Sequence, residues 1–315
     1  MRSSPRNKAV IYMLSSTLSL AVTGLITQYL TSYFIALDLA LLRFLAPAIL
    51  LFAFLTFYGL RVPPKTMRRV LLNRAVCIAA CQLCFIYALG KLSLIESVVL
   101  FATGPLFIAL FEKVISRVQL LPQTLVALVL TFVGVILLAG DPQEATLKPE
   151  LIIGLMAGVF NAGSQLGLHR ASKGTMTGTE NNAWTFLLAS IILMPVALLY
   201  HTTIDTVQFT PALTGSPLLY LAIFLLTLMI VNTQVCRYKA YKTAETNTQV
   251  APLIYTNLIF TAVFQFALFD TSFTSMQLLG IGLIVLGNLI PALFPALLKF
   301  KRFHIRQSPS HSTSI

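Results

Sequence analysis

The sequence predicts an all-α integral membrane protein with ten transmembrane helices, arranged as two inverted five-helix repeats with both termini in the cytoplasm. Of the 315 residues, 57% are apolar and only 10% are charged, which is too little polar surface for a soluble chain of this size. Apolar stretches of about 20 residues, the length that crosses a bilayer, recur along the chain, and basic residues gather between alternate stretches. This pattern excludes soluble enzymes and disordered proteins.

Ten apolar stretches are separated by charged or polar segments. In the first half they are Ala9–Leu30, Leu37–Leu60, Ala75–Leu92, Leu94–Ile115 and Leu121–Ala139. In the second half they are Leu151–Leu168, Asn182–Tyr200, Pro217–Val235, Thr246–Phe269 and Met276–Leu297. The third, fourth and fifth stretches are joined so tightly that hydropathy alone does not separate them with certainty. The placement of charge therefore has to support the count.

The basic residues support ten spans. With both termini in the cytoplasm, every lysine and arginine falls in an inner segment except Lys91 and Lys148, which are outer, and Arg43, which lies within the second span. Such an excess is typical of cytoplasmic segments, so the net charge of +12 does not indicate a nucleic-acid partner. We expect a multi-pass protein of the cell (inner) membrane whose partners are the lipid bilayer and a small-molecule substrate. Monomer and homodimer remain alternatives.

Two corresponding prolines indicate an internal repeat. Pro105 lies in a Gly-Pro-Leu-Phe segment of the fourth span and Pro252 in an Ala-Pro-Leu-Ile segment of the ninth. We expect residues 1–145 to form the first repeat, 146–300 the second, and 301–315 a basic, disordered cytoplasmic tail. Because five spans cross the membrane an odd number of times, the second repeat must be inverted. Inverted repeats with interrupted helices are typical of secondary transporters, although either proline alone could be a tolerated kink.

Several segments carry a family resemblance. They are Leu42-Arg43-Phe44-Leu45, Ser97 to Phe107, Gln277-Leu278-Leu279-Gly280 and Leu286-Gly287. With these segments the chain resembles the drug/metabolite transporter superfamily, specifically its EamA-type ten-span transporters, over residues 9–297. The resemblance implies carriage of small metabolites by alternating access, with substrates as varied as amino acids, nucleotide-like compounds and toxic cations. One departure is that members often carry an acidic residue at the end of the fourth span, where this chain has Val118 and Gln119.

Polar side chains within spans are candidates for the substrate site, because such groups must face protein or water. Arg43 could clamp a carboxylate or phosphate. The alternative, favoured because the resemblance places an arginine here across members with different substrates, is a structural residue that caps helix carbonyls or pairs with Asp38. Asn161 and Gln165 share one face of the sixth span and could line a cavity or make interhelical hydrogen bonds. The substrate-binding candidates are Arg43, Gln82, Asn161, Gln165, Tyr255 and Asn257.

Other residues are candidates for movement and coupling. Pro105 and Pro252 are expected to break their helices or act in gating. Glu96 and His169 are the titratable groups closest to the expected pathway, although Glu96 could instead be an acid favoured at a helix N-terminus. We expect no metal and no cofactor, because the cysteines form no paired zinc-binding pattern.

The leading hypothesis is a secondary transporter of a small metabolite, an exporter or exchanger of an amino acid, nucleotide-like or related compound. A channel or membrane-embedded scaffold is the alternative, followed by a membrane-embedded enzyme. The chain contains neither an HExxH nor a GxSxG motif, so we expect no enzyme activity, and it lacks the phosphate-binding motif of ATP-driven pumps. Import and export, and proton coupling, exchange and uniport, remain open alternatives.

Overall fold

The protein is described by a computed structural model, and the part of the chain that it describes is helical without strands. The described residues are 5–116, 122–138, 149–172, 174–203, 217–243, 253–254, 256–269, 274–287 and 290. The first-half helices are α1 (Pro5–Leu30), α2 (Ala36–Tyr58), α3 (Lys65–Leu89), α4 (Leu94–Phe101), α5 (Gly104–Ser116) and α6 (Pro122–Leu138). The second-half helices are α7 (Pro149–Ser172), α8 (Gly178–Thr203), α9 (Pro217–Thr243), α11 (Thr256–Leu268) and a helix at Ser275–Gly287.

Six of these helices, namely α1, α2, α3, α7, α8 and α9, have the length and composition needed to cross a membrane. Shorter apolar helices occupy the regions of the fourth, ninth and tenth expected spans. The described part of the chain is therefore all-helical, and its long apolar helices are those of a multi-pass membrane protein.

Helix bounds differ from the apolar stretches in two ways. The fourth expected span is divided, since α4 ends at Phe101 and α5 begins at Gly104, immediately before Pro105. In addition, α3 begins at Lys65 rather than Ala75, and α9 continues to Thr243. Hydropathy marks where a helix meets lipid, but a helix can continue beyond the apolar stretch, where charged residues such as Lys65, Arg69 and Lys242 are exposed.

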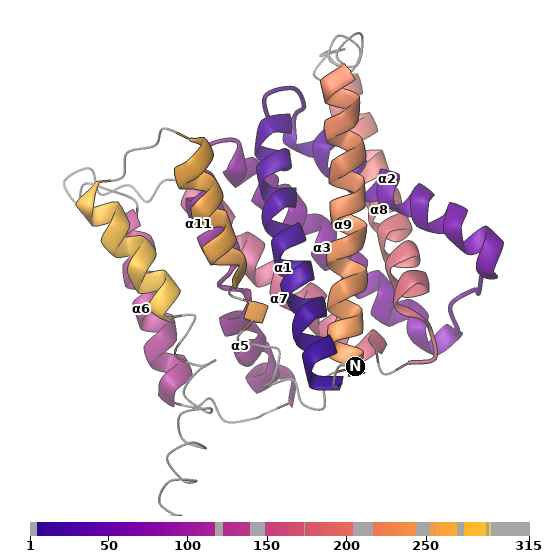
Figure 1. Ribbon diagram of the computed structural model, residues 1–315, viewed down its shortest axis with the longest axis horizontal. Helices are drawn as coiled ribbons and strands as arrows, with labels where there is room; N and C mark the ends of the chain where they lie inside the picture. The colour runs from indigo at the N-terminus through magenta and orange to yellow at the C-terminus, as the bar shows by residue number, and fades with distance from the viewer. Residues whose placement is uncertain are drawn as a thin grey trace, which may run out of the picture.

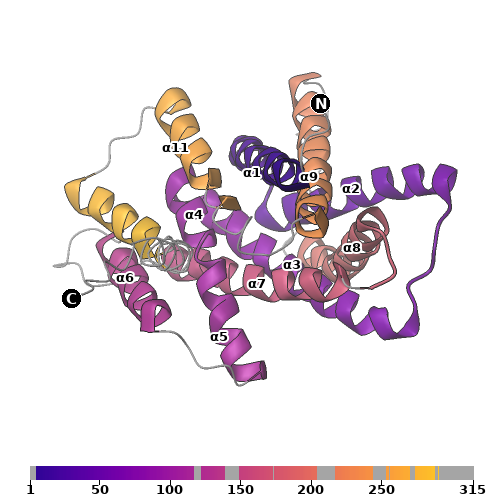
Figure 2. The same ribbon diagram turned by 60° about the horizontal axis from the view of Figure 1, so that its bottom comes forward.

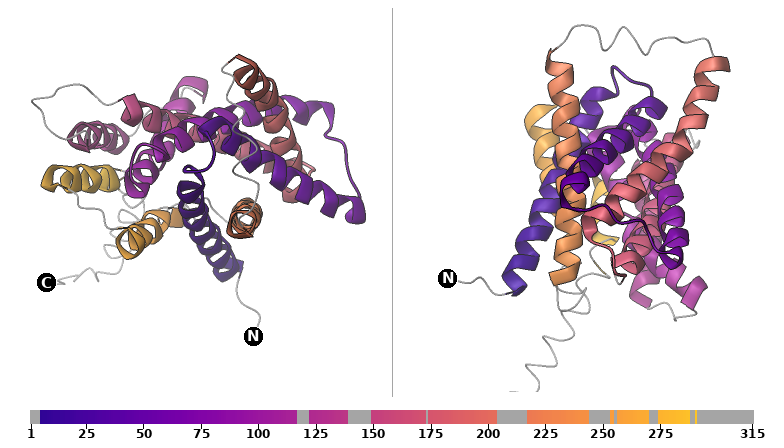
Figure 3. Two further views of the ribbon diagram at one scale, coloured as in Figure 1. Left: turned by 90° about the horizontal axis from the view of Figure 1, so that it is seen from above. Right: turned by 90° about the vertical axis from the view of Figure 1, so that its right-hand side faces the viewer.

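The helices form a bundle in which distant parts of the chain pack together. The most extensive contacts join α3 to α7, α1 to α9 and α2 to α8. Figures 1 and 2 show α1 and α9 side by side on one face, with α3 and α7 behind them. The α6 helix and Ser275–Gly287 lie at one end of the bundle, away from α2 and α8 (Figure 3). Every major contact therefore joins the first half of the chain to the second.

Glycines allow α3 and α7 to approach closely. A Cβ atom added at Gly167 would lie 2.8 Å from the Cβ atom of Arg74, and one added at Gly163 would lie 2.7 Å from Sγ of Cys77. Without a hydrophobic force between helices in lipid, such close packing supplies much of the association energy. It also holds the α3 face that carries Arg74 rigidly against α7.

Candidate functional site

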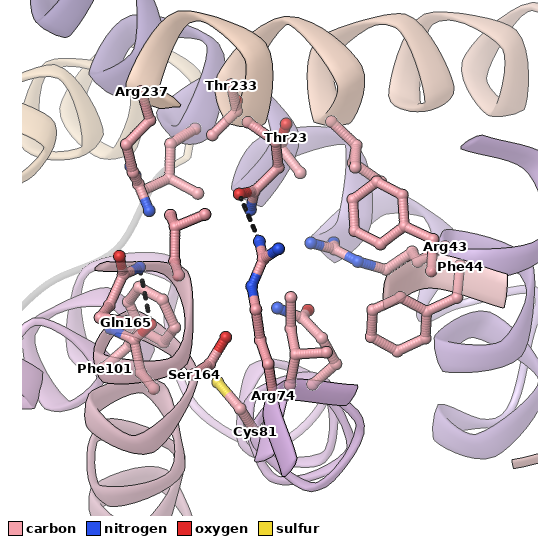
Figure 4. Close-up of a pocket in the computed structure, with 18 residues that line it drawn as sticks. Thr23, Arg43, Phe44, Arg74, Cys81, Phe101, Ser164, Gln165, Thr233 and Arg237 are labelled. Atoms are coloured by element: carbon pink, nitrogen blue, oxygen red, sulfur yellow. Dashed lines mark hydrogen bonds between the residues drawn. The ribbon is translucent and has the colours of Figure 1, made fainter. Parts of the chain in front are cut away.

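A polar cavity lies where helices from both halves of the chain meet (Figure 4), and we call it the central cavity. Its volume is about 50 Å³. It is lined by Leu20, Thr23, Arg43, Phe44, Arg74, Ile78, Cys81, Gln82, Phe101, Asn161, Ser164, Gln165, Leu168, Phe186, Ile230, Thr233, Gln234 and Arg237. An adjoining cavity of about 50 Å³ shares Asn161, Gln165 and Arg237 and adds Tyr241 and Asn257. Together they place three arginines and several amides around one small space.

Arg74 is held in place by polar groups of α8 and α9. Its side chain is 1% exposed, and its Nη1 atom donates hydrogen bonds to Oδ1 of Asn181 at 2.9 Å and Oγ1 of Thr185 at 3.0 Å. Its Nη2 atom donates to Oδ1 of Asn182 at 2.9 Å and, more weakly, to Oε1 of Gln234 at 3.5 Å. These acceptors are all uncharged, so they orient the guanidinium without neutralising it.

Arg43 is buried on α2 and faces the same cavity (Figure 4). Its Nη1 atom donates to Oγ1 of Thr27 on α1, whose hydroxyl donates in turn to the carbonyl of Thr23. The suggested pairing with Asp38 is wrong. Asp38 instead contacts Nε2 of His201 at 2.9 Å, because the first turn of α2 lies beside the last turn of α8.

Arg237 reaches the cavities from α9, on the side opposite α3 (Figure 4). Its side chain is 5% exposed. Its Nε atom is buried without a hydrogen-bond partner among the described residues, and no carboxylate of a described residue forms an ion pair with it. The Nε atom of Arg237 is therefore available to a ligand.

The amides of α7 lie between the two cavities. Nε2 of Gln165 donates to Oδ1 of Asn161 at 3.3 Å, which leaves Oε1 of Gln165 buried and unpartnered. The break between α4 and α5 abuts the same point, since a Cβ atom added at Gly104 would lie 2.8 Å from Nδ2 of Asn161. The interrupted helix is thus in direct contact with the cavity lining.

The structure brings five of the six substrate-binding candidates to these cavities. Arg43, Gln82, Asn161 and Gln165 line the central cavity and Asn257 lines the adjoining one. Tyr255 lies outside the described residues.

The gating and coupling candidates lie elsewhere or partly outside the described residues. Pro252 is outside the described residues, and only the helical backbone is described for Pro105 in α5 and His169 in α7. Glu96 lines neither cavity. Its carboxylate accepts hydrogen bonds from N and Oγ of Ser93 in a capping box at the start of α4, as its alternative interpretation supposed.

The sequence interpretation missed Arg74 and Arg237 by assigning both to inner segments. That assignment is corrected by their burial within α3 and α9. The spacing of the residues could have identified them. Arg74 precedes Gln82, a substrate-binding candidate, by two helical turns and therefore lies on the same face of its helix. Arg237 likewise follows Thr233 by one turn.

The side chains that line the central cavity are suited to hydrogen bonding with a polar molecule. Within the described ranges, no group of three His, Cys, Asp or Glu side chains is arranged to hold a metal ion. Guanidinium groups and side-chain amides recognise oxyanions and hydroxyl groups by hydrogen bonding. The cavity can thus hold a small polar molecule inside the bundle.

Comparisons with known proteins agree with this placement. The EamA-like transporter family matches residues 7–140 and again residues 148–291. The chain is 24% identical over 295 residues to an uncharacterized transporter of Helicobacter pylori (strain ATCC 700392 / 26695), covering 92% of this chain and 96% of the relative. A crystal structure has the same fold, with a TM-score of 0.56 at 17% identity over 95% of this chain and 99% of that one. Because the family match spans most of its length, the chain belongs to the EamA-like transporter family and is a membrane transporter.

Proposed function

We propose that the protein is a secondary transporter that binds a small metabolite in the central cavity and moves it by alternating access. The observation that carries this proposal is the cavity itself, whose polar lining comes from both halves of the chain. Secondary transporters with inverted repeats place their substrate sites at such an interface. A membrane-embedded scaffold has no need to keep polar groups unpartnered there, since burial of such groups costs free energy.

The proposed architecture is ten spans in two inverted repeats, divided near residue 145, with both termini in the cytoplasm of the cell (inner) membrane. The pattern of helix contacts supports it. If the helices of the two repeats correspond in order, α1 matches α7, α2 matches α8 and α3 matches α9. Under this correspondence, the contact between α3 and α7 is equivalent to the contact between α9 and α1. These two contacts are the most extensive in the bundle, as a two-fold repeat would produce.

The two ends of the α1 and α9 pair differ in a way that supports alternating access. Toward the start of α1, Ala9, Met13 and Ala240 form a buried apolar cluster, packed against Tyr241 and Ile254 of the adjoining cavity lining. Toward the end of α1 lies a hollow of about 760 Å³ between α1, α9 and the turn before α4. The α1 and α9 pair is therefore tightly packed at one end and hollowed at the other, a difference of the kind that alternating access requires.

Counterflow in liposomes tests the proposal. Purified protein is screened for thermal stabilisation by amino acids, organic acids, phosphate esters, nucleotides and lipophilic cations, because a ligand of the folded state raises apparent stability. Any hit is then loaded into proteoliposomes, and uptake of labelled compound is measured.

We expect saturable uptake that accelerates with substrate on the far side. Asn161→Ala should weaken it, whereas Asn73→Ala, on the exposed side of α3, should not. Flux without acceleration would indicate a channel, and binding without flux would indicate a scaffold.

A further inference from the structure

The described residues that line the central cavity carry positive charge and no negative charge. Arg43, Arg74 and Arg237 all line it, and each is at most 5% exposed. Among the residues that the structure describes, neither cavity is lined by an aspartate or glutamate. Among the described residues, the carboxylates in ion pairs are Asp38 and Glu180, and neither lines a cavity.

Burial of several like charges without a counter-charge is costly, because a low-dielectric interior neither solvates nor screens them. Neutral acceptors orient Arg74 and one hydroxyl accepts from Arg43, but these contacts leave the net charge unchanged. A ligand that carries negative charge would offset it. The three groups also reach the cavity from three different helices (Figure 4), so they can contact a ligand from several sides.

Resting on the transport function proposed above, we propose that the substrate is a compact organic oxyanion with two negative charges, of the size of a four-carbon dicarboxylate or a three-carbon phosphate ester. A dianion offsets two of the three guanidinium charges, whereas a monoanion offsets only one. An amino-acid zwitterion brings an ammonium group next to three guanidiniums, where no described carboxylate lines the cavity to receive it.

The size of the cavities sets the upper limit on the ligand. Each has a volume of about 50 Å³, and a single water needs roughly 10–15 Å³ by the same measure. Each of the two adjoining cavities therefore has room for roughly four water molecules, a size that suits a short dianion better than a nucleotide. The substrate class is thus narrower than the sequence alone implied.

The amides add a second element of selectivity. The Oε1 atoms of Gln82 and Gln165 are buried without partners among the described residues. An amide oxygen accepts a hydrogen bond from a hydroxyl group, and an unmade bond at a buried group costs binding energy. We therefore expect a hydroxylated dianion such as malate to bind more tightly than succinate.

The experiment compares ligands of different charge on the full-length protein in detergent at constant ionic strength. Malate, succinate and glycerol 3-phosphate are titrated beside glutamine, lactate and a lipophilic cation, with thermal stabilisation as the readout. We expect saturable stabilisation by at least one dianion at a concentration at which glutamine and the cation have no effect. Stabilisation by dicarboxylates alone or by the phosphate ester alone assigns the oxyanion, and either result supports the proposal.

Variants test whether the dianion binds in the central cavity. Arg237→Gln removes a guanidinium whose Nε atom has no hydrogen-bond partner among the described residues, so the fold should be retained. It should weaken dianion binding about tenfold to a hundredfold, and Arg237→Lys should recover part of the loss. The matched control is Arg69→Gln, on the exposed side of α3, which should leave affinity unchanged.

Three outcomes would overturn the inference. They are preferential binding of a zwitterion or cation, equal loss of affinity in the Arg69→Gln control, and stabilisation by anionic phospholipid but by no soluble dianion. Counterflow separates this test from that of the transport function. Counterflow of glutamine without any effect of dianions would support the transporter proposal and refute the dianion proposal. Tight binding of a dianion without counterflow would support a dianion site and refute the transporter proposal.

Discussion

The close contact between α7 and the break in the fourth span can be tested by adding one methyl group. A Cβ atom at Gly158 would overlap Oγ1 of Thr103 and lie 2.9 Å from the carbonyl oxygen of Leu100. The carbonyl belongs to the backbone of the last turn of α4, so it cannot rotate away as a flexible side chain can. Gly158→Ala must therefore push α7 and the α4–α5 break apart.

Two opposing contributions set the change in the free energy of unfolding in Gly158→Ala. Overpacking of a tight contact costs about 1–3 kcal/mol, and replacement of a helical glycine by alanine returns roughly 1 kcal/mol. Because one clash is with backbone, the cost should fall in the upper half of its range. We expect Gly158→Ala to lower the free energy of unfolding by about 1–2 kcal/mol.

Two other glycines provide matched controls. A Cβ atom at Gly154 meets chiefly Cδ1 of Leu100, at 2.7 Å, which is the end of a flexible side chain, and one at Gly282 meets nothing within 4 Å. Gly154→Ala should be close to neutral and Gly282→Ala should be stabilising by up to about 1 kcal/mol. Reversible unfolding in mixed micelles, followed by circular dichroism, gives the three values. Counterflow should fall most in Gly158→Ala.

A double mutant tests the proposed cause. Thr103→Ala removes the hydroxyl that a methyl group at Gly158 would overlap, although it also removes a hydrogen bond of 2.7 Å to the carbonyl of Leu100. Thr103→Ala should therefore lower the free energy of unfolding less in the Gly158→Ala background than in the wild type. The interaction free energy between the two substitutions should be about 1 kcal/mol. Equal stability of Gly158→Ala and Gly282→Ala, or strict additivity with Thr103→Ala, would refute the reasoning.

Three further predictions concern other parts of the bundle. Arg74→Lys should lower unfolding free energy by about 1–3 kcal/mol, because one ammonium group cannot reach all the acceptors of the guanidinium fork; unchanged stability in an unfolding titration would contradict this. Gly134→Leu should cost about 2 kcal/mol or more in the same assay, since an added Cβ atom already lies 2.7 Å from the backbone of the helix Ser275–Gly287, whereas Gly282→Leu should not. In a background lacking the four native cysteines, an impermeant maleimide should label Lys91→Cys on intact cells and Arg69→Cys only after permeabilisation, and the reverse pattern would invert the proposed topology.

How far sequence reasoning reaches is illustrated by the polar face of α7. The spacing of Asn161 and Gln165 predicted a shared helical face, and the structure places both at the central cavity. Periodicity determines which residues share a face, but it does not determine which helix that face meets. The contact with the α4–α5 break through Gly104 and Gly158 required the folded bundle.

Arg74 and Arg237 were missed for a different physical reason. Hydropathy treats arginine as a residue that must leave the membrane. It therefore predicts that the third span begins one residue after Arg74 and that the eighth ends two residues before Arg237. That treatment is correct for an arginine that faces lipid. It fails when neighbouring helices supply acceptors, as Asn181 and Asn182 of α8 do for Arg74.

The helices of the two proposed repeats correspond to each other, but the two arginines do not lie at corresponding positions. Arg74 lies in the first half of α3 and Arg237 in the second half of α9, so exchange of two inverted repeats does not superpose them. In the proposed topology α3 and α9 run in opposite directions, and both guanidiniums therefore belong to the cytoplasmic half of the bundle. In the proposed cycle, a symmetric backbone would open equally to either side, whereas the asymmetric charge would hold the proposed anionic ligand at one depth. Equivalent helices can thus move around a ligand site that is itself not duplicated.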